Sequence, residues 1–122
     1  MNFVVALDHV QIAIPRHAED RARAFYCELL GLVEIPKPAP LAARGGLWLE
    51  VGNLQMHLGV EEPFHPAGKA HPALRIRLYR DLLDKLREAG YEVRVDTMLD
   101  GIERSFVDDP FGNRVELINA AT

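Results

Sequence analysis

The stretch LQMHLGV, residues 54–60, gives its two sides very different side chains. In a β-strand, side chains alternate between the two faces, and one face is usually buried. Here the apolar residues Leu54, Met56 and Leu58 share one face. The other face carries Gln55 and His57, followed by Gly59. Such a polar face either meets water, as one face of many antiparallel sheets does, or lines a cavity. The rest of the chain must decide between these two interpretations.

The residues before this strand predict a complete small module. Alternation, helical spacing and turn residues indicate these elements in order: a strand at 7–15, a helix at 17–31, and strands at 32–35, 46–51 and 54–60. The last two strands are joined by Gly52-Asn53, a dipeptide typical of hairpin turns.

The residues after this strand repeat the same order of elements. The second set is predicted as follows: a strand at 73–78, a helix at 80–90, and strands at 91–95, 102–108 and 113–118. Matching features recur about 60 positions apart, as in an internal duplication. We therefore expect one α+β domain at 1–122 built from two repeats, approximately 5–60 and 70–119.

The polar residues also repeat. His9 and His71 each open the first strand of their half, and His57 and Glu116 occupy equivalent places in the last strand. All four lie on the face opposite the aliphatic residues. Imidazole nitrogens and a carboxylate oxygen are suitable ligands for a divalent first-row metal, and a cation would compensate a buried glutamate. The pattern predicts a metal site, although any one of the four could instead be solvated or bonded to a neighbour.

Other polar side chains are predicted near the same cavity. Strand alternation and nearby loops indicate these candidates for substrate binding: Gln11, Gln55, Arg44, Lys69, Arg75, Phe106 and Arg114. Arginines there would favour an anionic substrate, because guanidinium pairs well with carboxylate or phosphate. A solvated arginine at the rim is an equally open alternative. Trp48 and the pair Phe25-Tyr26 are interpreted as structural.

Composition limits the remaining possibilities. The chain of 122 residues has a net charge of −4 and no basic run, which argues against a nucleic-acid partner. No apolar run approaches the roughly 20 residues of a membrane-spanning helix, and MNFVVALDHV lacks the pattern of a signal peptide. Cys27 is the only cysteine, so no internal disulfide can form. We expect a cytoplasmic protein with a small-molecule partner and no membrane association.

Three segments together resemble the vicinal oxygen chelate superfamily, which includes glyoxalases, bleomycin resistance proteins and dioxygenases. These are LDHVQIAIP, AFYCELLGL and VDDPFGNRVELI. The resemblance covers almost the whole chain and implies two βαβββ modules that form a cupped, barrel-like mixed sheet with the helices outside. It also implies a homodimer, as in many members.

The resemblance further implies a function. The metal, which would be zinc, nickel, cobalt, manganese or ferrous iron, would be held by His9, His71 and Glu116, with His57 as fourth ligand or base. It would chelate two adjacent oxygens of a small, anionic substrate, in lyase or isomerase chemistry in which His57 and Glu116 are the catalytic candidates.

The chain also departs from particular members of this family. Glyoxalase I usually has a glutamate where this chain has His57. The fosfomycin-resistance enzymes have the same metal trio, but a threonine and a tyrosine stand where this chain has Gln11 and Phe106. A drug- or metabolite-binding protein without chemistry, as in bleomycin resistance, and a fosfomycin-type thiol transferase are the alternatives.

Overall fold

The computed structural model describes every residue from Met1 to Thr122 and divides the chain into two compact units. Unit 1 is Met1–His65, and unit 2 is Pro66–Thr122. The boundary falls between the two repeats that the sequence predicts, so each unit corresponds to one repeat. No helix combines the length and the apolar character that crossing a membrane requires.

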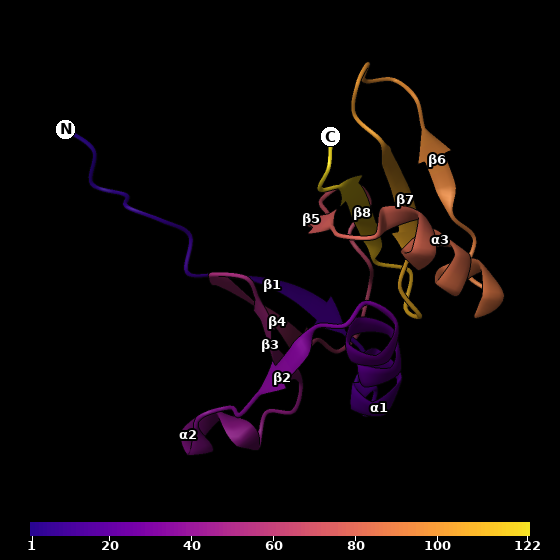
Figure 1. The fold of residues 1–122 in the computed structure, drawn as a ribbon. Coiled ribbons are helices and arrows are strands. Elements are labelled where there is room, and N and C mark those ends of the chain that lie inside the picture. The colour runs from indigo at the N-terminus through magenta and orange to yellow at the C-terminus, as the bar shows by residue number, and fades with distance from the viewer. The chain divides into compact units, whose positions relative to one another are not determined.

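Unit 1 contains a four-stranded sheet, two short α-helices and a π-helical turn (Figure 1). Its elements are β1 (His9–Ile14), α1 (Glu19–Arg23), η1 (Ala24–Leu29), β2 (Val33–Ile35), α2 (Ala39–Ala42), β3 (Leu47–Val51) and β4 (Leu54–Val60). The strand order is β1-β4-β3-β2, with β1 parallel to β4 and the other pairs antiparallel. The predicted helix is present, but its second half, Ala24–Leu29, forms the π-helical turn η1. Helix α2 was not predicted.

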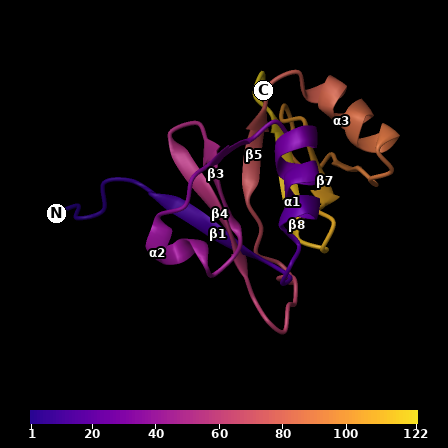
Figure 2. The ribbon, with the colours of Figure 1, turned by 90° about the horizontal axis from the view of Figure 1, so that it is seen from below.

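Unit 2 repeats this topology with a single helix (Figure 2). Its elements are β5 (Ala73–Ile76), α3 (Tyr79–Glu88), β6 (Arg94–Asp96), β7 (Arg104–Asp108) and β8 (Arg114–Asn119). The strand order is β5-β8-β7-β6, with β5 parallel to β8 and the rest antiparallel. Two βαβββ modules are thus confirmed. Strand β5 stops at Ile76, two residues earlier than predicted, because the chain turns there and Leu78 has a φ of 53°.

The aliphatic faces of the central strands are buried, as alternation predicts, whereas Val10 on the edge strand β1 is exposed. In unit 1, Met56 and Leu58 of β4 and Leu49 of β3 are almost wholly inaccessible. In unit 2, Val115 and Leu117 of β8 are fully buried, and α3 packs against that strand. The Tyr79 hydroxyl of α3 is hydrogen-bonded to the Ser105 hydroxyl of β7. Each unit therefore has one buried aliphatic face and one face with polar side chains.

The start of β3 is tied to helix α1 and crowded against β4. The backbone N–H of Gly46 donates to Glu19 Oε2 at 2.8 Å, and this hydrogen bond holds the pKa of Glu19 below its ordinary value. Gly46 has a φ of 83°, and a Cβ atom there would lie 2.1 Å from the carbonyl oxygen of Leu58. Only glycine fits this junction, which sets how β3 and β4 meet.

Candidate functional site

The four predicted metal ligands occur as two pairs, one in each unit. His9 and His57 lie on adjacent strands β1 and β4 of unit 1, on the same face of the sheet. His71 precedes β5 in unit 2, and Glu116 lies on the neighbouring strand β8. No group of three or more His, Cys, Asp or Glu side chains is arranged to hold a metal ion.

Three rings form a stack on the polar face of unit 1. The Trp48 and His57 ring centroids are 4.1 Å apart with planes at 4°, and those of His57 and His9 are 4.0 Å apart with planes at 17°. Trp48 is the register partner of His57 on β3, so both side chains project to the same side. The interpretation of Trp48 as a purely structural residue therefore misses its contact with the site. Counting alternation back from His57 across the hairpin would have found this contact.

His57 is held as a neutral ring at the centre of this stack. Its side chain is buried, and its Nε2 is 2.8 Å from Gln55 Oε1. The amide oxygen can only accept, so Nε2–H donates and Nδ1 keeps the lone pair. Burial, followed by the charge of nearby His9, lowers the pKa of His57. A neutral imidazole with one free lone pair can serve as a base or a ligand.

His9 is oriented by the residue directly before it. Its Nδ1 lies 2.9 Å from Asp8 Oδ2. Because Nδ1–H donates to this carboxylate, Nε2 carries the lone pair of the neutral ring. Metal-binding histidines usually have such an oxygen partner on the other ring nitrogen, which fixes the tautomer and the ring direction. Sequence reasoning did not assign a role to Asp8.

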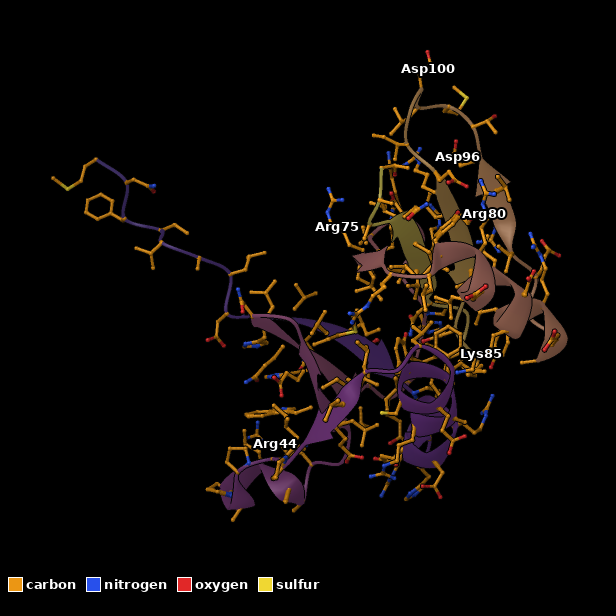
Figure 3. All side chains as sticks on the ribbon, in the orientation of Figure 1. Arg44, Arg75, Arg80, Lys85, Asp96 and Asp100 are labelled. Atoms are coloured by element: carbon orange, nitrogen blue, oxygen red, sulfur yellow. The ribbon has the colours of Figure 1, made fainter.

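A cavity of about 600 Å³ adjoins the stack within unit 1. The predicted residues Gln11, Gln55 and Arg44 all line it, and so does Lys37, which sequence reasoning missed. Figure 3 shows Arg44 beside α2. The Lys37 ammonium donates to the backbone carbonyl of Gly45. Two cationic side chains thus border a cavity whose only acidic lining residue, Asp8, is engaged with His9.

Gly59 makes room for one of the predicted binding residues. A Cβ atom at this position would lie 2.9 Å from the amide group of Gln11, so the Gln11 side chain extends over the backbone of β4 there. Gly59, which follows the polar pair on β4, therefore leaves room for the Gln11 amide on this face of the strand. The polar face of β4 therefore borders a cavity. Of the two interpretations of residues 54–60, the structure supports the one in which this face lines a cavity.

The pair in unit 2 consists of an imidazole facing a carboxylate. His71 Nε2 lies 2.9 Å from Glu116 Oε1, and His71 Nδ1 lies 2.8 Å from the backbone carbonyl of Lys69. Since a carbonyl can only accept, Nδ1–H donates to it, and Nε2 is the nitrogen with the lone pair in a neutral ring. In that case two hydrogen-bond acceptors, His71 Nε2 and the ionised Glu116 Oε1, would face each other without a hydrogen between them, which is unfavourable. A proton or a metal ion between them removes that conflict.

The donors of this pair are suitable for a metal ion. Metal–nitrogen and metal–oxygen bonds are about 2.1 Å long, so two such ligands are about 3.0 Å apart at the right angle of an octahedral ion and about 3.4 Å apart at the tetrahedral angle of zinc. The observed distance between Nε2 and Oε1 is 2.9 Å. Little movement of His71 or Glu116 would therefore be needed to hold a divalent ion between them.

Glu116 already has a counter-charge in its own unit. Arg104 on β7 donates from one terminal nitrogen to Glu116 Oε2 at 3.1 Å and from the other to Asp96 Oδ2 at 2.7 Å. Burial raises the pKa of Glu116, but hydrogen bonds from His71, when its Nε2 carries a proton, and from Arg104 outweigh burial and lower it overall. The carboxylate thus stays ionised with protein partners alone. The burial of Glu116 therefore does not by itself require a metal ion, contrary to what the sequence suggested.

Of the substrate-binding candidates predicted in unit 2, some lie around His71 and one is exposed away from it. Phe106 is the register partner of Glu116 and meets the His71 ring edge to face at 5.6 Å. The Arg114 guanidinium lies 5.8 Å from the Phe106 ring centre and donates to the carbonyl of Gly68. Lys69 contributes its backbone carbonyl to His71. Arg75 is exposed and projects away from β5 in Figure 3.

Comparisons with known proteins agree with this architecture. The family model of the Glyoxalase/Bleomycin resistance protein/Dioxygenase superfamily matches residues 6–117. A crystal structure from Bacillus anthracis, assigned in its description to the glyoxalase family, is 44% identical, with coverage of 98% of each chain and a TM-score of 0.92. No curated protein matches the chain.

Two more distant solved structures share the fold alone. The fosfomycin resistance protein FosX of Listeria monocytogenes is 13% identical, with coverage of 96% of this chain and 94% of its own, at a TM-score of 0.78. The lactoylglutathione lyase of Agrobacterium tumefaciens is 16% identical, with coverage of 97% and 96%, at a TM-score of 0.72. From the family match and the close relative, we conclude that the chain belongs to the Glyoxalase/Bleomycin resistance protein/Dioxygenase superfamily.

Proposed function

We propose that this protein is a metal-dependent enzyme that acts on a small anionic molecule chelated through two adjacent oxygens. His9, His71 and Glu116 hold the ion, and the reaction is of the lyase or isomerase type. His9 belongs to unit 1, and His71 and Glu116 belong to unit 2. A homodimer is part of this proposal.

One observation carries the proposal. The two histidines at equivalent places in the repeats both use Nδ1 to donate to an oxygen, of Asp8 in one unit and of Lys69 in the other. Both therefore offer Nε2, and in unit 2 this nitrogen lies next to a carboxylate oxygen. An orienting oxygen on the remote nitrogen is the usual second partner of a metal-binding histidine.

The chemistry expected at this site is polarisation of oxygen. A bound divalent ion would act as a Lewis acid on the two substrate oxygens and stabilise negative charge that develops on them. Lys37 and Arg44 would attract an anionic group of the substrate into the cavity of unit 1. His57 would take a proton through Nδ1, because its Nε2–H is committed to Gln55.

His57→Gln tests the role of base against that of fourth ligand. The structure favours the base, because the ring is neutral and stacked between Trp48 and His9. We expect the turnover number to fall by about a hundredfold, the usual contribution of a positioned base, while metal content stays unchanged. Steady-state kinetics and elemental analysis of the same sample provide the two readouts. Loss of the metal together with the activity would instead make His57 a ligand.

The double variant Lys37→Met/Arg44→Met tests the anionic character of the ligand. Removing two charges from the cavity of unit 1 is expected to weaken binding of a small dicarboxylate or phosphonate by about tenfold, the effect of one good charged hydrogen bond. Lys85→Met/Arg87→Met, which removes two cations from α3 in unit 2, serves as the matched control. Calorimetric titration measures both. Equal affinities in the two double variants would refute an anion site at Lys37 and Arg44.

A second candidate function is reversible binding without chemistry. It is favoured by the ion pair between Arg104 and Glu116, which compensates the buried carboxylate without any metal. A binding protein would take up its ligand equally well before and after treatment with a strong chelator. An enzyme of the proposed type would lose ligand affinity together with the ion, so one titration in each state distinguishes the two.

A further inference from the structure

A line of charged and polar groups crosses the whole sheet of unit 2. Asp96 of β6 pairs with Arg104 of β7 at 2.7 Å, Arg104 pairs with Glu116 of β8 at 3.1 Å, and Glu116 meets His71 beside β5 at 2.9 Å. The Asp96, Arg104 and Glu116 side chains are between 11% and 19% exposed. Each of β6, β7 and β8, and the segment before β5, thus contributes one residue to this line. Because these side chains are mostly buried, solvent screens their contacts only in part.

The guanidinium of Arg104 is held by its two carboxylate partners. Its two terminal nitrogens are used by Asp96 and Glu116, while its Nε is buried with no hydrogen-bond partner. The carbon at the centre of the guanidinium lies 5.4 Å from the centre of the Phe106 ring. A buried donor without a partner costs free energy. The contacts with Asp96 and Glu116 must outweigh that cost, and they therefore determine where the guanidinium lies.

Asp96 has a specific consequence for any metal near Glu116. A lone guanidinium next to Glu116 would repel a divalent cation, but the Asp96 carboxylate at 2.7 Å offsets most of that charge. The pair of Asp96 and Arg104 then acts toward Glu116 mainly as a directed hydrogen-bond donor. It occupies Oε2 and leaves Oε1 facing His71.

We propose that Arg104 is the positioning residue of this site, fixed by Asp96, and that it makes Glu116 offer a single oxygen, Oε1, next to His71 Nε2. Its effect on metal affinity rests on the function proposed above, whereas its effect on the orientation of Glu116 does not. One-oxygen attachment by Glu116 leaves more of the ion's coordination sphere open to a chelating substrate than two-oxygen attachment would.

The first test measures metal affinity by calorimetry. Arg104→Met is expected to weaken binding by about 10–100-fold, the usual cost of losing an outer partner of a ligand, and Arg104→Lys to restore part of the loss. Arg94→Met is the matched control, because Arg94 pairs with Asp108 at 2.9 Å on the same sheet and has no bond to Glu116. Unchanged affinity in Arg104→Met, or an equal loss in Arg94→Met, would overturn the proposal.

The second test needs no metal and separates this proposal from the proposed function. In crystal structures of the metal-free protein, Arg104→Met is expected to turn Glu116 away from His71, whereas Arg94→Met keeps the pair together. Asp96→Asn provides a second variant if Arg104→Met does not fold, and it is expected to displace Arg104 and Glu116 together. An unmoved Glu116 refutes the proposal. If the wild-type protein binds no metal, the enzyme proposal fails while this geometry still decides the role of Arg104.

Discussion

Glu116→Gln is expected to lower the affinity for a divalent metal by more than about 100-fold. This exceeds the loss expected when only a hydrogen-bond partner of a metal ligand is removed. The amide keeps the size of the side chain but removes its charge and one of its acceptor oxygens. Glu116 is buried beside His71 and Arg104, so no solvent-exposed carboxylate can readily replace it. Titration of the metal-free variant with zinc, nickel and manganese measures the loss.

Glu103→Gln is the matched control for this prediction. Glu103 pairs with Arg80 at 3.2 Å and accepts from the Asn119 amide, and it contacts neither histidine. The control should bind metal as the wild-type protein does. If Glu116→Gln retained wild-type affinity, Glu116 would not be a ligand, and the His71–Glu116 contact would be a structural ion pair.

The second large effect is expected from Gly46→Ala, which should reduce the free energy of unfolding by about 3 kcal/mol. A side chain at a φ of 83° costs about 1–2 kcal/mol by itself. The added Cβ would also lie 2.1 Å from the carbonyl oxygen of Leu58, so β4 would have to move. Clashes of this kind belong to the mechanisms that produce the larger losses among single substitutions.

Urea denaturation of Gly46→Ala beside Gly68→Ala measures this effect. Nothing lies within 4 Å of a Cβ at Gly68, so that control should unfold close to the wild-type midpoint. A Gly46→Ala variant within about 0.5 kcal/mol of the wild-type protein would show that the junction is not as tight as described. Since β3 carries Trp48 and β4 carries His57, the variant should also disturb the stack and weaken ligand binding.

Much of the fold could be predicted because two repeats supply the same signals. Alternation and hairpin glycines place β4 at its observed bounds, Leu54–Val60, and place β8 within one residue. Helix α2 escaped prediction because PKPAP reads as a stop, although proline is acceptable in a first helical turn. The π-helical turn η1 escaped because its residues keep ordinary helical spacing.

The candidate site could be predicted by residue type but not by contact. Equivalent positions in the repeats identified the two pairs, and alternation placed Phe106 on the face of Glu116. The contact between Arg104 and Glu116 depends on which residues face each other across β7 and β8, and strand alternation alone does not give that register. Lys37 lies outside the strands, where no periodicity shows which way a side chain points. Asp8 falls inside the strand predicted at 7–15, but β1 begins only at His9, so alternation does not apply to it.

The most direct test of the account is the metal content of the tag-free protein, measured by elemental analysis beside His71→Ala and Glu116→Ala. We expect about one divalent ion for each set of His9, His71 and Glu116 in the wild-type protein, and none in either variant. A wild-type protein that holds no metal after incubation with nickel, zinc and manganese would contradict it. The rings of unit 1 and the ion pairs of unit 2 would then be the lining of a binding protein.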